Sequence, residues 1–244
     1  MIEVINLKKS FEDKDVLKGI DCTFNTGEVN LIIGRSGAGK TVFMKSMIGL
    51  IAPTEGQILF DGRDIVKMEK KELRKLRQEM GMLFQGSALF DSMNVFENVL
   101  FPMELFSKET RSNQKKRVKE LLERVGLADA GRKFPSEISG GMMKRTAIAR
   151  AIALKPRYLF CDEPNSGLDP KTSLSIDQLL AQITHEEKIT TIVNTHDMNT
   201  VRSIGDKILY LRHGQKSWIG SSKTLETDAT EDVQRFVNAS LLPA

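Results

Sequence analysis

The segment from 34 to 41 constrains the fold of this chain more than any other part of the sequence. It follows the spacing G-x-x-x-x-G-K-[ST] and reads Gly34-Arg35-Ser36-Gly37-Ala38-Gly39-Lys40-Thr41. An apolar run at 29–33 precedes the segment and predicts a buried strand, and a helical pattern begins near Lys40. The glycines allow backbone angles and close approaches that a side chain would block. The sequence therefore predicts a strand, a tight loop and a helix in direct succession.

This loop has the chemistry of a phosphate-binding site. Its N–H groups and the positive end of the following helix would face an anion. Lys40 can reach the β- and γ-phosphates of a nucleotide, and the Thr41 hydroxyl can ligate Mg²⁺. A chance match is expected in about 1% of chains of this length, before the flanking strand and helix are required. We therefore expect phosphate binding, although the loop alone does not specify the nucleotide.

Strand-like and helical segments alternate through most of the remaining chain. Strands are expected at 2–7, 20–24, 28–33, 57–60, 80–84, 158–161, 190–194, 207–211 and 216–219. Helices are expected at about 69–79 and 171–186. The middle of the chain, 87–155, has helical patterns at 95–106, 112–125 and 140–154 and predicts an insert. The alternation of strands and helices predicts an α/β fold.

Composition excludes several classes of protein. The 36 basic and 32 acidic residues give a net charge of +4, which does not by itself indicate a nucleic-acid partner. The two cysteines, Cys22 and Cys161, form no metal-binding pattern and fit a reducing cytosol. The N-terminus does not resemble a signal peptide, and no window approaches the roughly 18 apolar residues of a membrane span. Any action at a membrane is therefore expected to depend on partners.

Two acidic residues end the apolar run at 158–161. Successive side chains of a strand point to opposite faces, so Asp162 and Glu163 should diverge and serve different purposes. We assign Asp162 to the shell of Mg²⁺ and Glu163 to general-base activation of the attacking water. The alternative is a strand end that simply reaches solvent with two charges. The complete phosphate loop earlier in the chain favours the functional interpretation.

A second candidate anion site lies at Ser139-Gly140-Gly141. Ser139 is a candidate helix N-cap, and the helical pattern follows the two glycines. Exposed N–H groups, a hydroxyl and the positive end of the helix dipole would all face the same anion. One nucleotide hardly needs two such sites from one chain. A head-to-tail dimer explains both, because the phosphate loop of each copy would face Ser139 of the other.

With these motifs in order, the chain resembles the ATP-binding subunits of ABC transporters over nearly its whole length. The resemblance implies a P-loop NTPase with a RecA-like core, an antiparallel β subdomain and an α-helical subdomain. It implies ATP and Mg²⁺ as ligands. Beyond the phosphate loop, the matching positions are Phe11 against adenine, Gln85 in the Q-loop, Ser139–Gly141 in the signature, Asp162 and Glu163 in Walker B, 166–169 in the D-loop and His196 as the switch histidine.

The resemblance also implies roles for individual residues. Gln85 is expected to contact Mg²⁺ or water and to couple the site to a membrane partner. His196 is expected to contact the γ-phosphate, and Gln85, Glu163 and His196 form the expected catalytic set. Phe11 could equally belong to the core.

Two positions depart from the family pattern. Met142 stands where the signature commonly has glutamine, and a methionine cannot donate or accept as an amide does. Gly167 stands where the D-loop commonly has alanine. Neither change touches the residues expected to bind phosphate, so we expect an active ATPase. The effect of Met142 on turnover does not follow from the sequence.

Three segments resemble the Mla/Mce-type branch, which serves phospholipid transport between the inner and outer membranes. They are the Q-loop region 84–99, the Ser-Gly-Gly-Met signature and the tail 231–238. In that branch the tail helps to hold the dimer and a small regulatory partner. The apolar residues after Gln85 would form a groove lip for a helix of the permease, or they would simply be the core of the insert. The residues in question are Leu89, Phe90, Met93 and Phe96.

Other branches remain as alternatives. An amino-acid importer and a lipoprotein-release ATPase share the same motifs. DNA-repair and chromosome members carry a long coiled coil, whereas here only about 50 residues without heptads separate Gln85 from Ser139. Translation-type members usually join two cassettes in one chain, and this chain has one.

The sequence thus predicts one ABC ATPase domain over 1–244. Residues 1–86 and 156–224 should form the core with the antiparallel β subdomain, 87–155 the helical subdomain, and 225–244 the tail. We expect a homodimer bound to an integral-membrane permease, with an MCE-domain subunit and a small regulatory subunit as further partners and no nucleic acid. The expected location is the cytoplasmic face of the inner membrane, and neither the cargo nor its direction follows from the sequence.

Overall fold

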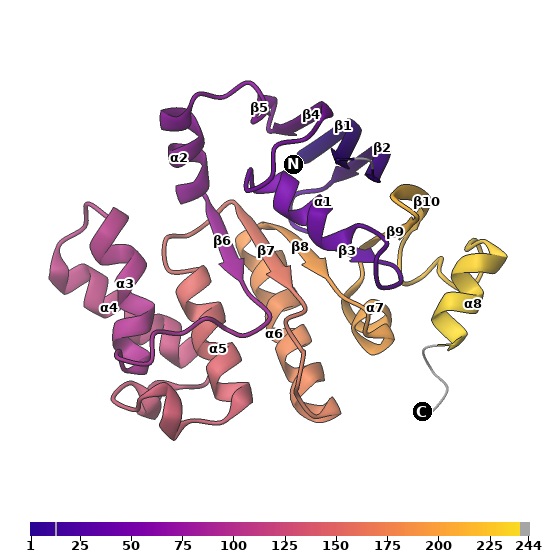
Figure 1. Ribbon diagram of the computed structural model, residues 1–244. Helices are drawn as coiled ribbons and strands as arrows, with labels where there is room; N and C mark the ends of the chain where they lie inside the picture. The colour runs from indigo at the N-terminus through magenta and orange to yellow at the C-terminus, as the bar shows by residue number, and fades with distance from the viewer. Residues whose placement is uncertain (13, 240–244) are drawn as a thin grey trace.

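A computed structural model describes residues 1–12 and 14–239, with the side chains of 238 and 239 left out. Two sheets form the framework (Figure 1). The smaller sheet has the order β2-β1-β4-β5 and is antiparallel. Its strands are β1 (Ile2–Phe11), β2 (Lys14–Phe24), β4 (Glu55–Phe60) and β5 (Arg63–Asp64).

The larger sheet has the order β10-β9-β3-β8-β7-β6. Its strands are parallel except β10, which is antiparallel to β9. They are β3 (Val29–Ile33), β6 (Met80–Leu83), β7 (Tyr158–Asp162), β8 (Thr190–Asn194), β9 (Lys207–Arg212) and β10 (Gln215–Gly220). The central strands β3, β7 and β8 are buried almost throughout, as expected for a parallel sheet covered on both faces.

The larger sheet has α1 on one face and α6 and α7 on the other. The helices of the described residues are α1 (Lys40–Met47), α2 (Lys70–Gln78), α3 (Val95–Phe106), α4 (Arg111–Arg124), α5 (Gly140–Ala151), α6 (Pro170–Glu187), α7 (Met198–Ile204) and α8 (Glu231–Ala239). Short 3-10 turns lie at Ala128–Ala130 and Pro135–Glu137. Alternation along β3 divides the core, because Ile32 packs toward α1 and the smaller sheet while Leu31 and Ile33 face α6 and α7.

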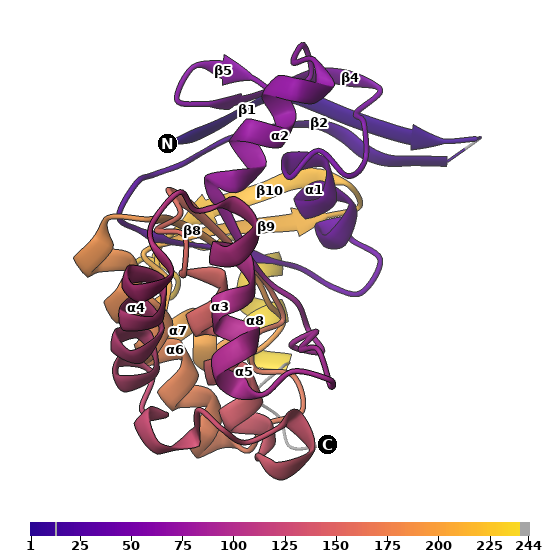
Figure 2. The same cartoon turned by 90° about the vertical axis from the view of Figure 1, so that its left-hand side faces the viewer.

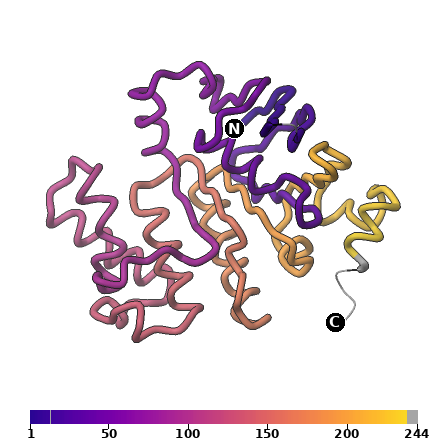
Figure 3. Tube along the Cα trace, in the orientation of Figure 1, coloured from indigo at the N-terminus to yellow at the C-terminus, as the bar shows by residue number. Residues whose placement is uncertain are grey.

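The helices α3, α4 and α5 gather beside β6, at the edge of the sheet farthest from β10 (Figures 1 and 3). Figure 2 shows the smaller sheet lying across the larger one, with these helices at the opposite end of the molecule. Gly81 lets α5 approach β6 closely, since a Cβ there would lie 2.4 Å from the carbonyl oxygen of Ala151. The end of α5 therefore lies directly against the edge strand of the larger sheet.

The α/β fold with a RecA-like core, an antiparallel sheet and a helical part is confirmed. The helix expected at 69–79 lies at Lys70–Gln78, where a Glu69–Glu72 capping box starts it. The helix α7 was not predicted from the sequence, because its seven residues are too few to show a clear helical period.

Candidate functional site

A cleft lies where β3, β7 and β8 end, at the carboxyl edge of the parallel strands. Its volume is about 1290 Å³, and its lining includes the whole segment 34–41. The loop after β7 contributes Glu163 to Leu168, apart from Pro164, and the loop after β8 contributes Thr195 to Asp197. Open α/β sheets bind ligands in such crevices because the loops at strand ends converge there. Three separate predicted motifs therefore share one cleft.

The glycines of segment 34–41 are required by its backbone. Gly34 has a φ of +153° and lies so close to β9 that a Cβ would be 2.4 Å from the carbonyl oxygen of Leu211. Gly39 precedes α1 in the left-handed region with a φ of +101°. Alanine at position 34 would force the loop away from the sheet, and the start of α1 would move with it.

The ammonium of Lys40 lies against its own loop. Its Nζ donates to the carbonyl oxygens of Gly34 at 2.8 Å and Arg35 at 3.3 Å. Burial lowers the pKa of Lys40, and the nearby carboxylates of Glu163 and Asp162 oppose that shift. The cation is thus held between the loop and the two acids.

Two candidate oxygen ligands for a divalent cation, Thr41 and Asp162, lie near this lysine in the sequence or in space. Thr41 is the second residue of α1, and its neighbours in the loop line the same cleft. Asp162 ends β7, where its Oδ1 accepts a hydrogen bond from Asn194 Nδ2 at 2.6 Å. Mg²⁺ takes one or two protein oxygens together with substrate phosphates and water, so a hydroxyl and a carboxylate fit it. Among the described residues no cluster of three or more His, Cys, Asp or Glu side chains could hold a metal without the nucleotide.

Three predicted catalytic side chains meet around one carboxylate. Glu163 Oε1 lies 2.9 Å from His196 Nδ1, and Glu163 Oε2 accepts from Gln85 Nε2 at 3.1 Å. Gln85 Nε2 also lies 3.2 Å from Ser166 Oγ. The backbone of Glu163 is left-handed, with a φ of +46°, and its N–H donates to the carbonyl of Asn194 at 2.8 Å. Non-glycine residues in that region carry strain that concentrates at functional sites.

The described lining of this cleft contains none of Ser139, Gly140 and Gly141, although a Cβ at Gly140 would lie 3.4 Å from Leu168 Cδ2, and Leu168 lines the cleft. Ser139 caps α5, because its Oγ accepts from the N–H of Met142 at 3.3 Å. Ser139 and Gly140 are exposed. Gly141 packs so tightly on α6 that a Cβ would lie 2.7 Å from Thr172 Cγ2. The start of α5 is thus not part of the cleft's described lining, and anion binding there stays a prediction.

Two cations from α5 hold the loop that follows Gln85. Lys144 Nζ donates to the Gln85 carbonyl, and the Arg150 guanidinium donates to the carbonyls of Ser87 and Ala88, both at 2.7 Å. Ser87 and Ala88 have φ values of +62° and +47°. Burial lowers the pKa of both Lys144 and Arg150. The role of these cations was not predicted from the sequence, although a lysine on the largely apolar face of a helix can indicate a buried charge with a specific partner.

Phe11 lies outside the described lining of the cleft. Its side chain is 43% exposed, and Lys9 Nζ lies 4.7 Å from the centre of its ring. The cleft on this side is lined by Val16, His213 and Phe236, which come from β2, the β9–β10 turn and α8. No short motif marks these three residues. The adenine contact of Phe11 stays a prediction.

The fold and this cleft define a P-loop nucleotide-binding cassette. A sequence profile described as ABC transporter matches residues 17–166, and the chain belongs to this family. The family binds ATP with Mg²⁺, and its cassettes dimerise and work with membrane permeases. Within residues 1–12 and 14–239, no helix is both long and apolar enough to cross a membrane.

Two curated relatives illustrate the similarity. The probable ribonucleotide transport ATP-binding protein mkl of Mycobacterium tuberculosis is 40% identical over 237 residues, which are 97% of this chain and 66% of the relative. This chain thus spans just under two thirds of that protein. The methionine import ATP-binding protein MetN of Clostridium tetani is 38% identical over 244 residues, 100% of this chain and 76% of the relative.

Two solved structures have the same fold. The structure of cbiO1 from Clostridium perfringens, part of the ABC transporter complex cbiONQ, has a TM-score of 0.87 and 32% identity. The match covers 98% of this chain and 95% of that one. A dimeric ATP-binding cassette, MJ0796, in a post-hydrolysis state bound to ADP and Pi, has a TM-score of 0.81 and 31% identity over 91% and 99% of the two chains.

Proposed function

We propose that this chain hydrolyses ATP as the motor subunit of an ABC transporter. The observation that carries the proposal is the convergence of Gln85, Glu163 and His196 within hydrogen-bond distance at the edge of the phosphate loop. Lys40 would hold the terminal phosphates. Glu163 would accept a proton from the attacking water, while Gln85 and His196 fix its carboxylate from both sides. Bound with ATP, Mg²⁺ would neutralise phosphate charge, held by Thr41, Asp162 and Gln85.

The complete site would need a second copy of the chain. Ser139 and Gly140 are exposed at the start of α5, where the first N–H groups of a helix have no intrahelical partner and Met142 N–H donates to Ser139 Oγ. In a head-to-tail dimer this helix end would cover the nucleotide held by the partner's phosphate loop. ATP would then join the two copies, and hydrolysis would release them.

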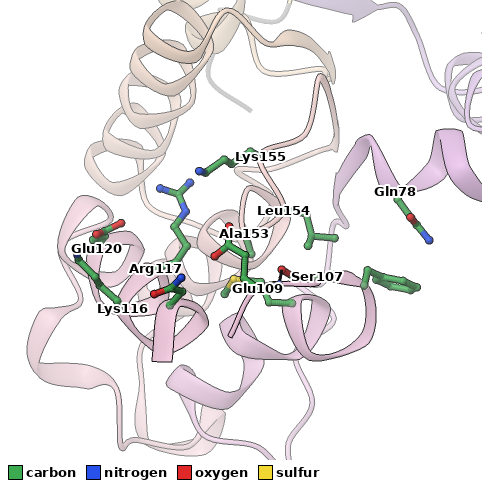
Figure 4. A pocket seen from close by; sticks show the side chains of 12 residues that line it. Gln78, Ser107, Glu109, Lys116, Arg117, Glu120, Ala153, Leu154 and Lys155 are labelled. Carbon is green, nitrogen blue, oxygen red and sulfur yellow. Dashed lines mark hydrogen bonds between the residues drawn. The ribbon is translucent and has the colours of Figure 1, made fainter. Parts of the chain in front are cut away.

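A groove between the core and the helices is suited to a helix of a permease. Its volume is about 460 Å³, and it runs from Gln78 at one end to Lys116 and Glu120 at the other (Figure 4). Phe106 lines it and is 53% exposed, and the neighbouring Leu105 is 56% exposed. Apolar side chains left in water at the rim of a groove mark interaction sites. We propose the permease contact here, at the end of α3, although the Leu89–Phe96 segment expected from the sequence lies at the start of that helix and does not line the groove.

For the cargo we propose phospholipid, carried between the inner and outer membranes with an MCE-domain subunit and a small regulatory subunit. The support is the resemblance of 84–99, the Ser-Gly-Gly-Met signature and the tail to the Mla/Mce-type branch. The rival is amino-acid import, which the 38% identity to a methionine import protein favours. In either case the chain would work at the cytoplasmic face of the inner membrane. We also propose the division into a core (1–86 and 156–224), a helical subdomain (87–155) and a tail (225–244).

Hydrolysis by the purified chain tests the proposed activity. Glu163→Gln should bind ATP as the unmodified chain does and should lose about 100-fold or more of the turnover rate. Lys40→Ala should lose ATP binding as well. Glu123→Gln, an exposed exchange on α4, is the matched control and should change neither quantity. Near-normal hydrolysis by Glu163→Gln would refute the assignment of the base.

The partners can be identified from membranes. The tagged chain, extracted in mild detergent, should retain a permease, and Phe106→Glu should lose it while keeping ATP hydrolysis. Leu174→Glu, at a residue 45% exposed on α6, is the control. An MCE-domain protein in the complex would support lipid transport, and a periplasmic binding protein would favour the importer.

A further inference from the structure

A buried carboxylate joins the two loops that carry Glu163 and His196. Asp177 lies on α6 and is 1% exposed. Its Oδ1 accepts from Asn165 Nδ2 at 2.7 Å, and its Oδ2 accepts from Thr200 Oγ1 at 2.8 Å. Asn165 Nδ2 also lies 3.1 Å from Thr200 Oγ1, which closes a three-membered network. None of these residues belongs to the set predicted from the sequence.

The network reaches the catalytic cluster through short stretches of backbone. Asn165 lies two residues after Glu163, in a turn where the Ser166 N–H donates to the Glu163 carbonyl at 3.2 Å. Thr200 lies on α7, which begins two residues after His196 (Figure 1). Glu163 and His196 are 2.9 Å apart, so a small shift of either loop would break their contact. Asp177 holds both loops from behind.

The surroundings of Asp177 make its charge costly. Burial raises its pKa to about 6, against the hydrogen bonds from Thr200 and Asn165. Among the charged and titratable groups facing it, the carboxylate of Asp197 at the start of α7 raises the pKa further. The Cys161 thiol faces Asp177 from β7. The Lys144 ammonium of α5 interacts with that thiol but does not act on Asp177. No described Lys or Arg forms an ion pair with Asp177, so the hydrogen bonds from Asn165 and Thr200 are what offset the cost of burying its charge.

We propose that Asp177, as an anion, is a positioning residue that sets the distance between Glu163 and His196 during ATP hydrolysis. Both donors of the network point at this carboxylate. A neutral carboxyl turns one of its oxygens into a donor, so the Thr200 hydroxyl would have to accept from Asp177 instead of donating to it, and only Asn165 would still donate to that carboxyl. The charge-assisted hydrogen bonds that tie the two segments to Asp177 would then be lost. The inference rests on the proposed ATPase function, and it concerns Asp177 and Thr200, which are not among the residues that line the described cleft.

The pH dependence of Asp177→Asn tests the proposal. Asparagine has the shape of the protonated carboxyl and never ionises. At pH 8 the variant should turn over about tenfold more slowly than the unmodified chain, the size expected for one lost buried hydrogen bond, with an unchanged KM for ATP. At pH 5 the two proteins should turn over at nearly equal rates, because the carboxyl of Asp177 is then mostly protonated and, like the asparagine of the variant, uncharged. The ratio of the two rates cancels titrations that both proteins share.

A second variant keeps the test valid if Asp177→Asn folds poorly. Thr200→Val removes one donor without changing shape and should also lower kcat rather than raise KM. Thr184→Val on α6 is the control, because Thr184 is equally buried and bonds the Leu180 carbonyl, away from the cleft. A rate ratio that stays constant from pH 5 to pH 8, or normal kcat in both variants, would overturn the proposal. Absence of hydrolysis by the unmodified chain would instead overturn the proposed function.

Discussion

The same carboxylate should make the protein less stable as the pH rises. Asp177 has a pKa of about 6 in the folded chain, raised by burial from an ordinary value of 3.8. The folded state therefore binds more protons than the unfolded state between these values, and stability falls as the pH rises through this window. The shift of about 2 units corresponds to about 3 kcal/mol in total. About 1.4 kcal/mol of this is lost between pH 5 and pH 8, since most of the window lies below pH 5.

Thermal unfolding of the unmodified chain and Asp177→Asn at several pH values measures this effect. The difference between the two melting temperatures should move in favour of the variant by about 3–6 °C between pH 5 and pH 8, at about 2–4 °C per kcal/mol for a chain of this size. Other titrating groups contribute equally to both proteins and cancel. A difference that does not change with pH would refute the raised pKa. A difference that moves in favour of the unmodified chain would show that Asp177 is stabilised, rather than penalised, as an anion.

Three further predictions concern the cleft and its loops. Arg150→Gln should release the left-handed turn at Ser87 and Ala88 and lower kcat about tenfold, measured against Arg132→Gln, an exposed control. Gly34→Ala should abolish ATP binding in a nucleotide titration, because the added Cβ would collide with the Leu211 carbonyl; unchanged affinity would contradict the described loop. Chelating Mg²⁺ should stop hydrolysis, while the chain should still bind nucleotide weakly through Lys40. Full turnover in the presence of chelator would contradict the proposal that Thr41, Asp162 and Gln85 hold a catalytic Mg²⁺.

Local patterns were sufficient to predict much of the fold. The buried strands β3, β7 and β8 are continuous apolar runs, and a capping box marks the start of α2, so short-range signals suffice for them. The order of the strands in the larger sheet could not be predicted from such local patterns. It depends on crossovers that bring β9 beside β3, far along the chain.

The candidate site divides in the same way. The phosphate loop, Asp162 and Glu163 can be identified from sequence spacing, because the residues proposed to do the chemistry there are adjacent in the chain. No local pattern marks Lys144, Asp177 and Thr200, since each acts through a tertiary contact with a segment at least 12 residues away. For Phe11, a match to a family position did not place the side chain in the cleft. The described lining of the cleft includes Val16 and does not include Phe11.

The mass of the chain in the presence of ATP tests the shared site most directly. Glu163→Gln should bind ATP without consuming it and should then elute at about 55 kDa, twice the 27.4 kDa of one chain, by light scattering. Adding Ser139→Arg to this variant should leave ATP binding intact but return the mass to 27.4 kDa, because the arginine would block the helix end that covers the partner's nucleotide. A single-chain mass for Glu163→Gln with ATP, or an undisturbed dimer in the double variant, would contradict the account.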